Sequence, residues 1–364
     1  MAECTFYVAT LSAAVERAAR IAPNKGTAFD MAAGIVLHVD PEKESASLRA
    51  TDLEVYYREE VKDVVDYGDE EVTWRLPSGL FAGILAGLPL DKEVTIEDDG
   101  ERRVRIFCGR KQAKLRMMPN DTYPQWERIL EDGLEPVSNF AHRVSQVAWA
   151  VDQDNIPFTG VNIDGEYLNA TDRYRLARVP CKVPLKAPVT VAMRTLSPIL
   201  KNLPGEVRMR AEERMLLLRV GDEIEATCAI YDRDYPDLSK ALRDDFEFAV
   251  KVDREALHNA IEAMLVLVKN ERYPRMNFDF EEGIIHLFMT VPETGDMSDI
   301  VEAEFDHSGT FSIDFTPTYL ISALAAGTSK NIYWSLGPSK ESMTRIKDDD
   351  YIAYIMPLSK GKTS

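Results

Sequence analysis

The sequence predicts an α+β protein built from three copies of one domain. Segments in which apolar residues alternate are interspersed with segments that carry apolar residues at helical spacing, which indicates strands and helices. The tripeptide Ala-Thr-Asp occurs at 50–52 and again at 170–172, each time between two strand-like segments. These copies are 120 residues apart in a chain of 364. That spacing is close to a third of the chain and to a usual domain size, so it indicates a threefold repeat.

Further dipeptides recur in the same order. They are Leu88-Pro89 and Leu203-Pro204, Tyr123-Pro124 and Tyr235-Pro236, and Met118-Pro119 and Met356-Pro357. We therefore expect domains at residues 1–127, 128–244 and 245–364. No long linker rich in Pro, Gly and Ser separates them, so we expect the copies to pack rigidly.

Each copy is expected to hold two helices packed on antiparallel sheet. The expected helices are residues 10–25, 78–89, 139–151, 192–204, 253–272 and 315–327. The expected strands are residues 4–8, 35–39, 53–61, 72–76, 94–97, 104–108, 113–117, several within 161–179, 207–209, 215–220 and 224–230. Thr10 or Ser12 is suited to cap the first helix, and the Pro23-Gly26 stretch to end it. Asp98-Asp99-Gly100 predicts a hairpin turn.

Composition places the chain among globular proteins, with 45% hydrophobic and 29% charged residues. The four cysteines, Cys4, Cys108, Cys181 and Cys228, are scattered. Their spacing argues against a zinc site and a disulfide framework, and for a reducing compartment. No signal-peptide pattern and no apolar run of membrane-spanning length is present. We therefore expect a cytoplasmic protein that does not contact membranes.

Motifs for catalysis are few. None of the five histidines has a second histidine or a cysteine at metal-ligand spacing. Asp52 and Asp172 are open to two interpretations, as paired general acid and base or as caps of the two repeated turns; the second is favoured. Asp348-Asp349-Asp350 is similarly better explained as an acidic turn than as a metal site. We expect no catalytic residue, no cofactor and no metal.

Taken together, several motifs resemble the bacterial DNA polymerase sliding clamp, or beta clamp, family. The motifs are Phe158-Thr159-Gly160-Val161, the segment Ala-Thr-Asp-Arg-Tyr-Arg-Leu-Ala at 170–177, Tyr-Pro-Asp-Leu at 235–238, Phe315 to Leu320, and Tyr-Ile-Met-Pro-Leu at 354–358. The resemblance covers the whole chain. It implies three DNA-clamp domains and a head-to-tail homodimer that forms a ring around double-stranded DNA. It also implies a processivity factor whose partners are the replicative DNA polymerase and the clamp loader.

The resemblance also implies a hydrophobic pocket that takes short peptide tails of partner proteins. Carried over motif by motif, its residues are Phe158, Thr171, Tyr174, Arg175, Leu176, Pro236, Ala241, Tyr354, Met356, Pro357 and Leu358. Apolar and aromatic walls with a few polar groups suit an extended peptide. The alternative for Leu176 and Tyr354 is that they belong to the core.

Net charge bears on DNA binding, because a chain of net charge −18 is repelled by nucleic acid if its charge is spread evenly. The six expected helices together carry +4, which leaves −22 for the rest. A ring with basic helices inside and acidic strands outside requires such a difference, although solvated acidic strands explain it too. The residues expected to face DNA are Arg17, Arg20, Lys25, Arg143, Arg194, Lys201 and Lys269. Leu267 and Val268 resemble dimer-interface positions of the family, where edge strands of domains one and three pair.

Three features depart from the family pattern. Arg173 stands where a glycine is common, Ala241 replaces a larger aliphatic residue, and six residues follow Leu358. The exact peptide preference is therefore open, and a phage-encoded or otherwise divergent clamp fits these departures. Two other functions stay open: a monomeric peptide-binding hub or inhibitor with the same fold, and a hydrolase that uses Asp52 and Asp172.

Overall fold

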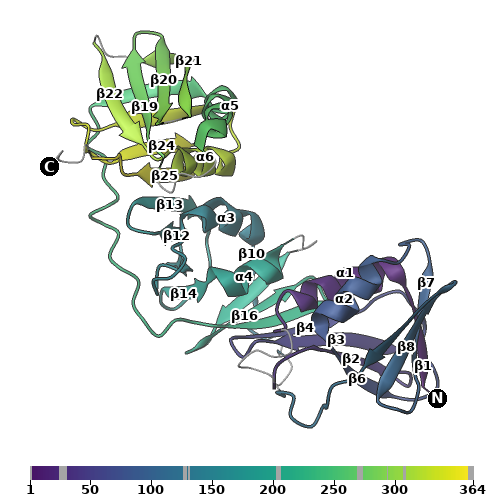
Figure 1. The fold of residues 1–364 in the computed structure, drawn as a ribbon. Helices are drawn as coiled ribbons and strands as arrows, with labels where there is room; N and C mark the ends of the chain where they lie inside the picture. The colour runs from purple at the N-terminus through teal and green to yellow at the C-terminus, as the bar shows by residue number, and fades with distance from the viewer. Residues whose placement is uncertain are drawn as a thin grey trace. The chain divides into compact units, whose positions relative to one another are not determined.

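The fold is described by a computed structural model of residues 2–23, 31–125, 129, 132–201, 206–268, 274–292, 294–305 and 309–359. Two compact units make it up, residues 1–138 with 194–232 and residues 139–193 with 233–364. Both units are α+β with antiparallel sheets (Figure 1), which confirms the predicted fold class. The boundaries expected at 127 and 244 stay a prediction. Strands from either side of each boundary share a sheet, because β4 pairs with β17 and β13 pairs with β25.

The first unit contains two antiparallel sheets. The smaller sheet consists, in spatial order, of β5 (Val64–Asp66), β1 (Glu3–Tyr7), β7 (Glu93–Asp98), β8 (Arg103–Cys108) and β9 (Lys111–Arg116). The larger sheet consists of β10 (Glu135–Val137), β15 (Val207–Ala211), β16 (Met215–Val220), β17 (Ile224–Ala229), β4 (Val55–Glu60), β3 (Ser45–Thr51), β2 (Ile35–Asp40) and β6 (Val72–Leu76). The predicted hairpin at Asp98-Asp99-Gly100 is confirmed: it joins β7 to β8, with Gly100 at φ +75°.

Helices of the first unit each bury apolar residues on one face. They are α1 (Val8–Ala19), α2 (Ser78–Ala86) and, from its second residue onward, α4 (Met193–Leu200). The expected cap of α1 at Thr10 or Ser12 is wrong. The helix begins two residues earlier, at Val8, whose N–H donates to the Lys92 carbonyl at 2.9 Å. It ends at Ala19, ahead of the Pro23-Gly26 stretch, of which residues 24–26 lie outside the described part of the chain.

The second unit is organised on one long antiparallel sheet. Its strands, in spatial order, are β14 (Val189–Ala192), β11 (Gly160–Ile163), β12 (Tyr167–Thr171), β13 (Arg175–Pro180), β25 (Tyr351–Ile355), β24 (Thr344–Asp348), β23 (Asn331–Leu336), β18 (Phe248–Asp253), β21 (Gly295–Phe305), β20 (Ile284–Val291), β19 (Met276–Glu281) and β22 (Phe311–Phe315). Pairing of β13 with β25 brings the centre of the chain beside its C-terminal strand.

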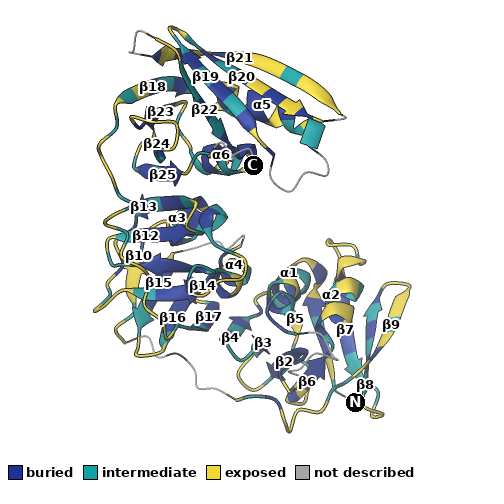
Figure 2. Cartoon of the chain, turned by 60° about the vertical axis from the view of Figure 1, so that its left-hand side comes forward, coloured by how far each residue is buried: buried dark blue, intermediate teal, exposed yellow. Residues whose placement is uncertain are grey.

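The helical segments of the second unit are α3 (Phe140–Val147), η1 (Ala148–Ala150), α5 (Arg254–Met264), η2 (Leu265–Val268) and α6 (Pro317–Ala326). One face of each of α3, α5 and α6 is buried (Figure 2). Trp334 is fully buried, and its ring centroid lies 5.3–5.5 Å from the ring centroids of Phe278, Phe280 and Phe315. None of the described helices has the length and apolar character needed to cross a membrane.

Candidate functional site

The corner between β12 and β13 is held by two side chains. Asp172 Oδ1 accepts hydrogen bonds from the N–H groups of Tyr174 and Arg175, both at 2.9 Å. Thr171 Oγ1 accepts one from the N–H of Arg173 at 3.0 Å. Arg173 lies at φ +80°, in the left-handed region that residues other than glycine seldom adopt. The side-chain bonds therefore offset a backbone conformation that is unfavourable for arginine.

The other Ala-Thr-Asp corner has the same construction. Asp52 Oδ1 accepts from the N–H groups of Glu54 at 2.9 Å and Val55 at 2.8 Å, and Thr51 Oγ1 accepts from the N–H of Leu53 at 3.0 Å. Leu53 lies at φ +76°. The expectation that both aspartates cap repeated turns is confirmed, and both carboxylates are engaged by backbone rather than presented to a substrate.

Beside the β12–β13 corner lies a rim of aromatic and charged side chains. The guanidinium of Arg173 lies 5.4 Å from the ring centre of Phe158, a cation–π distance. Phe158 meets Tyr235 edge to face at 6.0 Å. Arg173 is also 3.8 Å from Asp152, and Tyr174 is 61% exposed. Burial raises the pKa of the Tyr235 hydroxyl, so this group stays protonated. The rim thus presents aromatic faces and one positive charge.

A second cationic stack lies under the same corner. The Arg175 guanidinium lies 4.4 Å from the ring centre of Tyr319 and 5.4 Å from that of Trp149. Its Nε donates to Asp172 Oδ2 at 2.9 Å. One side chain thereby connects Trp149 of η1 and Tyr319 of α6 to the corner. Arg175 therefore orients the site and has little free charge to offer a ligand.

The C-terminal segment completes the site. Met356 N–H donates to the Tyr174 carbonyl at 2.8 Å, directly after β25. Met356 is 37% exposed. Leu176 and Tyr354 face each other in the β13–β25 ladder and are only 3% and 4% exposed. These two side chains therefore belong to the core, as the alternative interpretation held.

The remaining expected pocket residues are less closely tied to the rim. Leu358 N–H donates to the Asp314 carbonyl at 2.8 Å, and Leu358 lines a small cavity of about 280 Å³ with Asn277 and Ser312. Pro236 is exposed, and Ala241 and Pro357 are half-buried. The structure thus brings Phe158, Thr171, Tyr174, Arg175 and Met356 together around one corner.

Sequence reasoning missed four members of this site. Trp149, Asp152, Tyr235 and Tyr319 all contact its arginines or aromatic rings. Two of them could have been predicted from the sequence, since Tyr235 and Tyr319 belong to the motifs that carry the family resemblance. Trp149 and Asp152 had no such signal, because only the fold brings the end of α3 next to the corner.

The residues expected to face DNA are mostly paired with acids. Arg17 pairs with buried Glu59, Arg20 with Glu16, Arg143 with Asp350 and Arg194 with Glu54. Lys201 is exposed just after α4. Lys25 and Lys269 lie outside the described residues. The helices therefore carry arginines whose charge is largely compensated within the chain.

Two smaller expectations concern η2 and the acidic triplet. Leu267 and Val268, expected at a dimer interface, are half-buried on η2, and neighbouring Val266 is 62% exposed. Residues 348–350 end β24 and turn into β25. Asp348 accepts from the Ser329 N–H at 3.0 Å, and Asp350 pairs with Arg143. The interpretation of this triplet as an acidic turn is confirmed.

Comparison with known proteins gives a consistent result. Residues 5–127 match the family model described as DNA polymerase III beta subunit, N-terminal domain, and residues 240–359 match the one described as its C-terminal domain. A beta sliding clamp of Staphylococcus epidermidis is 23% identical over 344 residues, covering 88% of this chain and 90% of that protein. One from Staphylococcus aureus is 22% identical over 343 residues, with the same coverage.

Solved structures agree in fold. The beta subunit of Thermotoga maritima superposes with a TM-score of 0.85 at 19% identity, covering 99% of this chain and all of that one. A sliding clamp of Pseudomonas aeruginosa bound to griselimycin gives 0.83 at 21% identity, again covering 99% of this chain and all of that one. Because the two family models together match well over half of the chain, and the relatives match nearly its whole length, this chain belongs to the DNA polymerase III beta subunit family, the beta sliding clamps.

Proposed function

We propose that this protein is a DNA polymerase processivity factor, in which two copies form a closed ring around duplex DNA. The observation that carries the proposal is membership of the beta sliding clamp family, with matches at both ends of the chain. Enclosure holds DNA by topology, so the protein needs no sequence-specific contact with bases. It also needs no catalytic residue, and its two repeated aspartates are already occupied by backbone N–H groups.

Two exposed strands support closure of such a ring. In the first unit, β9 is the last strand of its sheet among the described residues and presents Lys111, Lys114 and Arg116 to solvent. In the second unit, residues 295–302 of β21 pair with β20 and, among the described residues, with no strand on their other side. This part of β21 exposes Asp296, Asp299 and Glu302. Figure 2 shows both strands as largely exposed.

These strand segments are complementary in charge, and within the described part of the chain each has one side on which no strand is paired. Such an edge is a template for pairing with another chain unless something covers it. We propose that β9 of one copy pairs head to tail with β21 of the next, with basic side chains opposite acidic ones. Leu267 and Val268 on η2 add apolar surface to the same interface. Two such contacts close a dimeric ring.

Inside the ring, the proposed contacts with DNA are weak, because the arginines that would make them are already paired with acidic residues. Arg17, Arg20, Arg143 and Arg194 each have an acidic partner in the chain. Compensated arginines release few counterions from DNA, so binding is loose and depends little on sequence. Loose contact favours movement along the duplex, and the closed ring prevents dissociation.

The corner at 171–175 is the proposed docking site for partner tails, those of the replicative polymerase and of the clamp loader. Phe158, exposed Tyr174 and Met356 supply apolar contacts. Arg173, whose carboxylate partner is 3.8 Å away, supplies a positive charge at the rim. An extended peptide with a hydrophobic residue fits this combination of anchors and orienting charge.

Sedimentation equilibrium tests the ring. We expect a species of twice the 41.0 kDa chain mass at micromolar concentration. The protein is first diluted to monomers and then concentrated with nicked circular plasmid, so that the ring can close around the DNA. It should then stay on the circular plasmid in high salt and dissociate when the plasmid is linearised. A monomer that leaves circles and linear DNA equally fast would contradict the proposal. That outcome would favour a peptide-binding hub that does not encircle DNA. The observation that favours this alternative is that the arginines expected to face DNA are paired with acids.

A further inference from the structure

One group of potential metal ligands lies outside every site described above. His38 and Asp40 are two residues apart on β2, so both side chains point to the same face of the sheet. Glu71 immediately precedes β6, which pairs with β2 in the register that sets His38 opposite Thr73. One ligand atom from each of the three lies within 4.8 Å of the others. Among the described residues, this is the one place where three such side chains come together.

The imidazole of His38 is held in a suitable orientation. Its Nδ1 is 3.0 Å from the Thr73 hydroxyl, and its Nε2 is 3.7 Å from a Glu71 carboxylate oxygen. A histidine that binds a metal through one ring nitrogen commonly uses the other in such a hydrogen bond, which fixes the ring and its tautomer. Nε2 lies on the side of the Glu71 carboxylate, and the neutral tautomer with its proton on Nδ1 leaves the Nε2 lone pair able to bind a metal.

The site already attracts a cation. Asp40 is only 4% exposed, and its Oδ2 accepts from the Lys43 ammonium at 2.5 Å. The Lys43 side chain itself is 77% exposed, on the turn after β2. A flexible surface ammonium can move away into water, whereas the buried carboxylate cannot. A divalent ion can therefore take the place of Lys43 beside Asp40.

We propose that His38 Nε2, Asp40 and Glu71 bind one divalent transition-metal ion of the Zn²⁺ class, with water in the remaining position. An imidazole nitrogen combined with two carboxylates suits Zn²⁺ and its neighbours. Mg²⁺ and Ca²⁺ prefer ligand sets made of oxygen alone. Glu71 is exposed, which leaves a route for the ion and its water.

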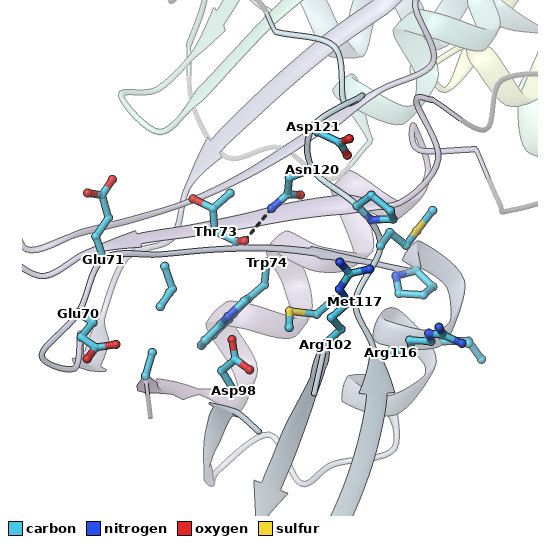
Figure 3. Close-up of a pocket in the computed structure, with 16 residues that line it drawn as sticks. Glu70, Glu71, Thr73, Trp74, Asp98, Arg102, Arg116, Met117, Asn120 and Asp121 are labelled. Carbon is cyan, nitrogen blue, oxygen red and sulfur yellow. Dashed lines mark hydrogen bonds between the residues drawn. The ribbon is translucent and has the colours of Figure 1, made fainter. Parts of the chain in front are cut away.

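The proposed metal site adjoins a cleft, and the ion would affect the wall of that cleft. Glu71 and Thr73 also line a cleft of about 1140 Å³, together with Trp74 and Met117 (Figure 3). Within this cleft the Asn120 side chain donates to the Thr73 carbonyl at 2.8 Å. A metal bridging β2 to the start of β6 ties down the edge strand that forms the cleft wall. Because the ion would bind the folded state and not the unfolded chain, it also stabilises the protein, by an amount that grows with the logarithm of the metal concentration above the dissociation constant.

Titration of the full chain with ZnCl₂ at pH 7.5, followed by calorimetry and thermal unfolding, tests the proposal. We expect one equivalent to bind and to raise the melting temperature. CoCl₂ should give visible absorption bands of a protein-bound ion. His38→Gln and Glu71→Gln should each weaken binding at least tenfold. Thr73→Ala should weaken it by about tenfold or more, the usual loss for a residue that orients a ligand.

Two further variants make the test specific. Lys43→Met should tighten binding, because it removes the cation that competes for Asp40. His286→Gln is the matched control: His286 lies 3.7 Å from Glu281, like His38 from Glu71, but belongs to no such group of three. Its loss should leave binding unchanged. Equal binding by wild type and His38→Gln, or no tightening in Lys43→Met, would overturn the proposal.

Discussion

At the scale of single residues, the two Ala-Thr-Asp corners show that local chemistry fixes the turn while the third residue is free to vary. Both corners use a threonine hydroxyl and an aspartate carboxylate in the same way. The residue after the aspartate has positive φ in both, yet it is Leu53 in one and Arg173 in the other. The Thr-Asp pair therefore determines the conformation, and the next position is available for function.

Replacement of Asp172 by alanine should therefore affect both stability and binding. The variant leaves the N–H groups of Tyr174 and Arg175 without their acceptor and removes the ion pair with Arg175. We expect a loss of about 0.5–1.5 kcal/mol for each hydrogen bond removed, the usual net contribution of one, because Tyr174 is exposed and Arg175 is only partly buried. Urea unfolding measures the loss. Binding of a polymerase tail peptide, followed by fluorescence anisotropy, should weaken as well.

Asp52→Ala is the matched control, since it disrupts the same turn in the other unit. It should destabilise the protein to a similar degree and leave peptide affinity unchanged. Equal loss of peptide binding in both variants would indicate a general effect of unfolding. It would then argue against a docking site at residues 171–175.

The cysteines offer a second prediction at this scale. All four are buried. Burial raises the pKa of Cys4 from 9.0 to about 12 and that of Cys181 to about 11. We expect no rapid reaction with Ellman's reagent at pH 8 in the native protein, and four reactive thiols after denaturation. Because Cys4 and Cys181 ionise near pH 9 only in the unfolded chain, folding stability should also fall as the pH rises from 9 toward 12. Fast reaction of a native thiol would contradict this assignment.

At the scale of elements, the edge strands β9 and β21 lead to a prediction about assembly. Lys111→Glu with Lys114→Glu places acids against Asp296 and Asp299 of the next copy. Like charges facing each other across an interface cost several kcal/mol. We therefore expect the dimer dissociation constant to rise more than tenfold, as measured by sedimentation equilibrium.

A compensating exchange distinguishes this contact from a general charge effect. Asp296→Lys with Asp299→Lys should restore the dimer when combined with the β9 variant. Lys182→Glu with Lys186→Glu changes the net charge by the same amount at exposed positions outside both strands, so it should leave the dimer intact. Dissociation by the control pair would show that net charge, rather than the β9–β21 contact, governs assembly.

Helices and strands could be predicted from the sequence where the pattern that indicates them lies in neighbouring residues. Alternation predicted β6 and β16 at their observed bounds, and helical spacing located all six expected helices. The start of α1 was missed because its first N–H is satisfied by the Lys92 carbonyl, a contact that no neighbouring residue reveals. The pairing of β4 with β17 and of β13 with β25 was equally out of reach, since the partners are far apart in sequence.

The same distinction holds for the candidate sites. The turn at 171–175 was predicted because the Thr-Asp chemistry that holds it lies in consecutive residues, whereas its part in a peptide site came from the family resemblance. The stack of Arg175 on Tyr319 and Trp149 required tertiary contacts. The His38, Asp40 and Glu71 group was missed for that reason too, because a search for metal-ligand spacing does not connect position 71 to β2.

At the scale of the whole molecule, the charge balance bears on the proposed contact with DNA. The net charge is −18, and the described helix arginines expected to approach DNA each have an acidic partner. Among these pairs, Arg194–Glu54 is open to solvent, with side chains 65% and 43% exposed. Its arginine is held by a surface pair of low stability. The affinity for DNA should therefore be adjustable at Glu54 without disturbing the fold.

Glu54→Gln should release Arg194 and strengthen binding to short linear duplex DNA, which cannot trap a ring. One freed arginine that neutralises a phosphate should make the slope of log affinity against log salt steeper by about 0.9. Fluorescence anisotropy at several salt concentrations measures this slope. Glu101→Gln is the control, because it loosens an exposed pair with Arg103 on a hairpin rather than on a helix, and the slope should not change. A steeper slope in both variants would mean that lost negative charge alone draws the protein to DNA, whereas a change confined to Glu54→Gln would identify the α4 side as the one that faces the duplex.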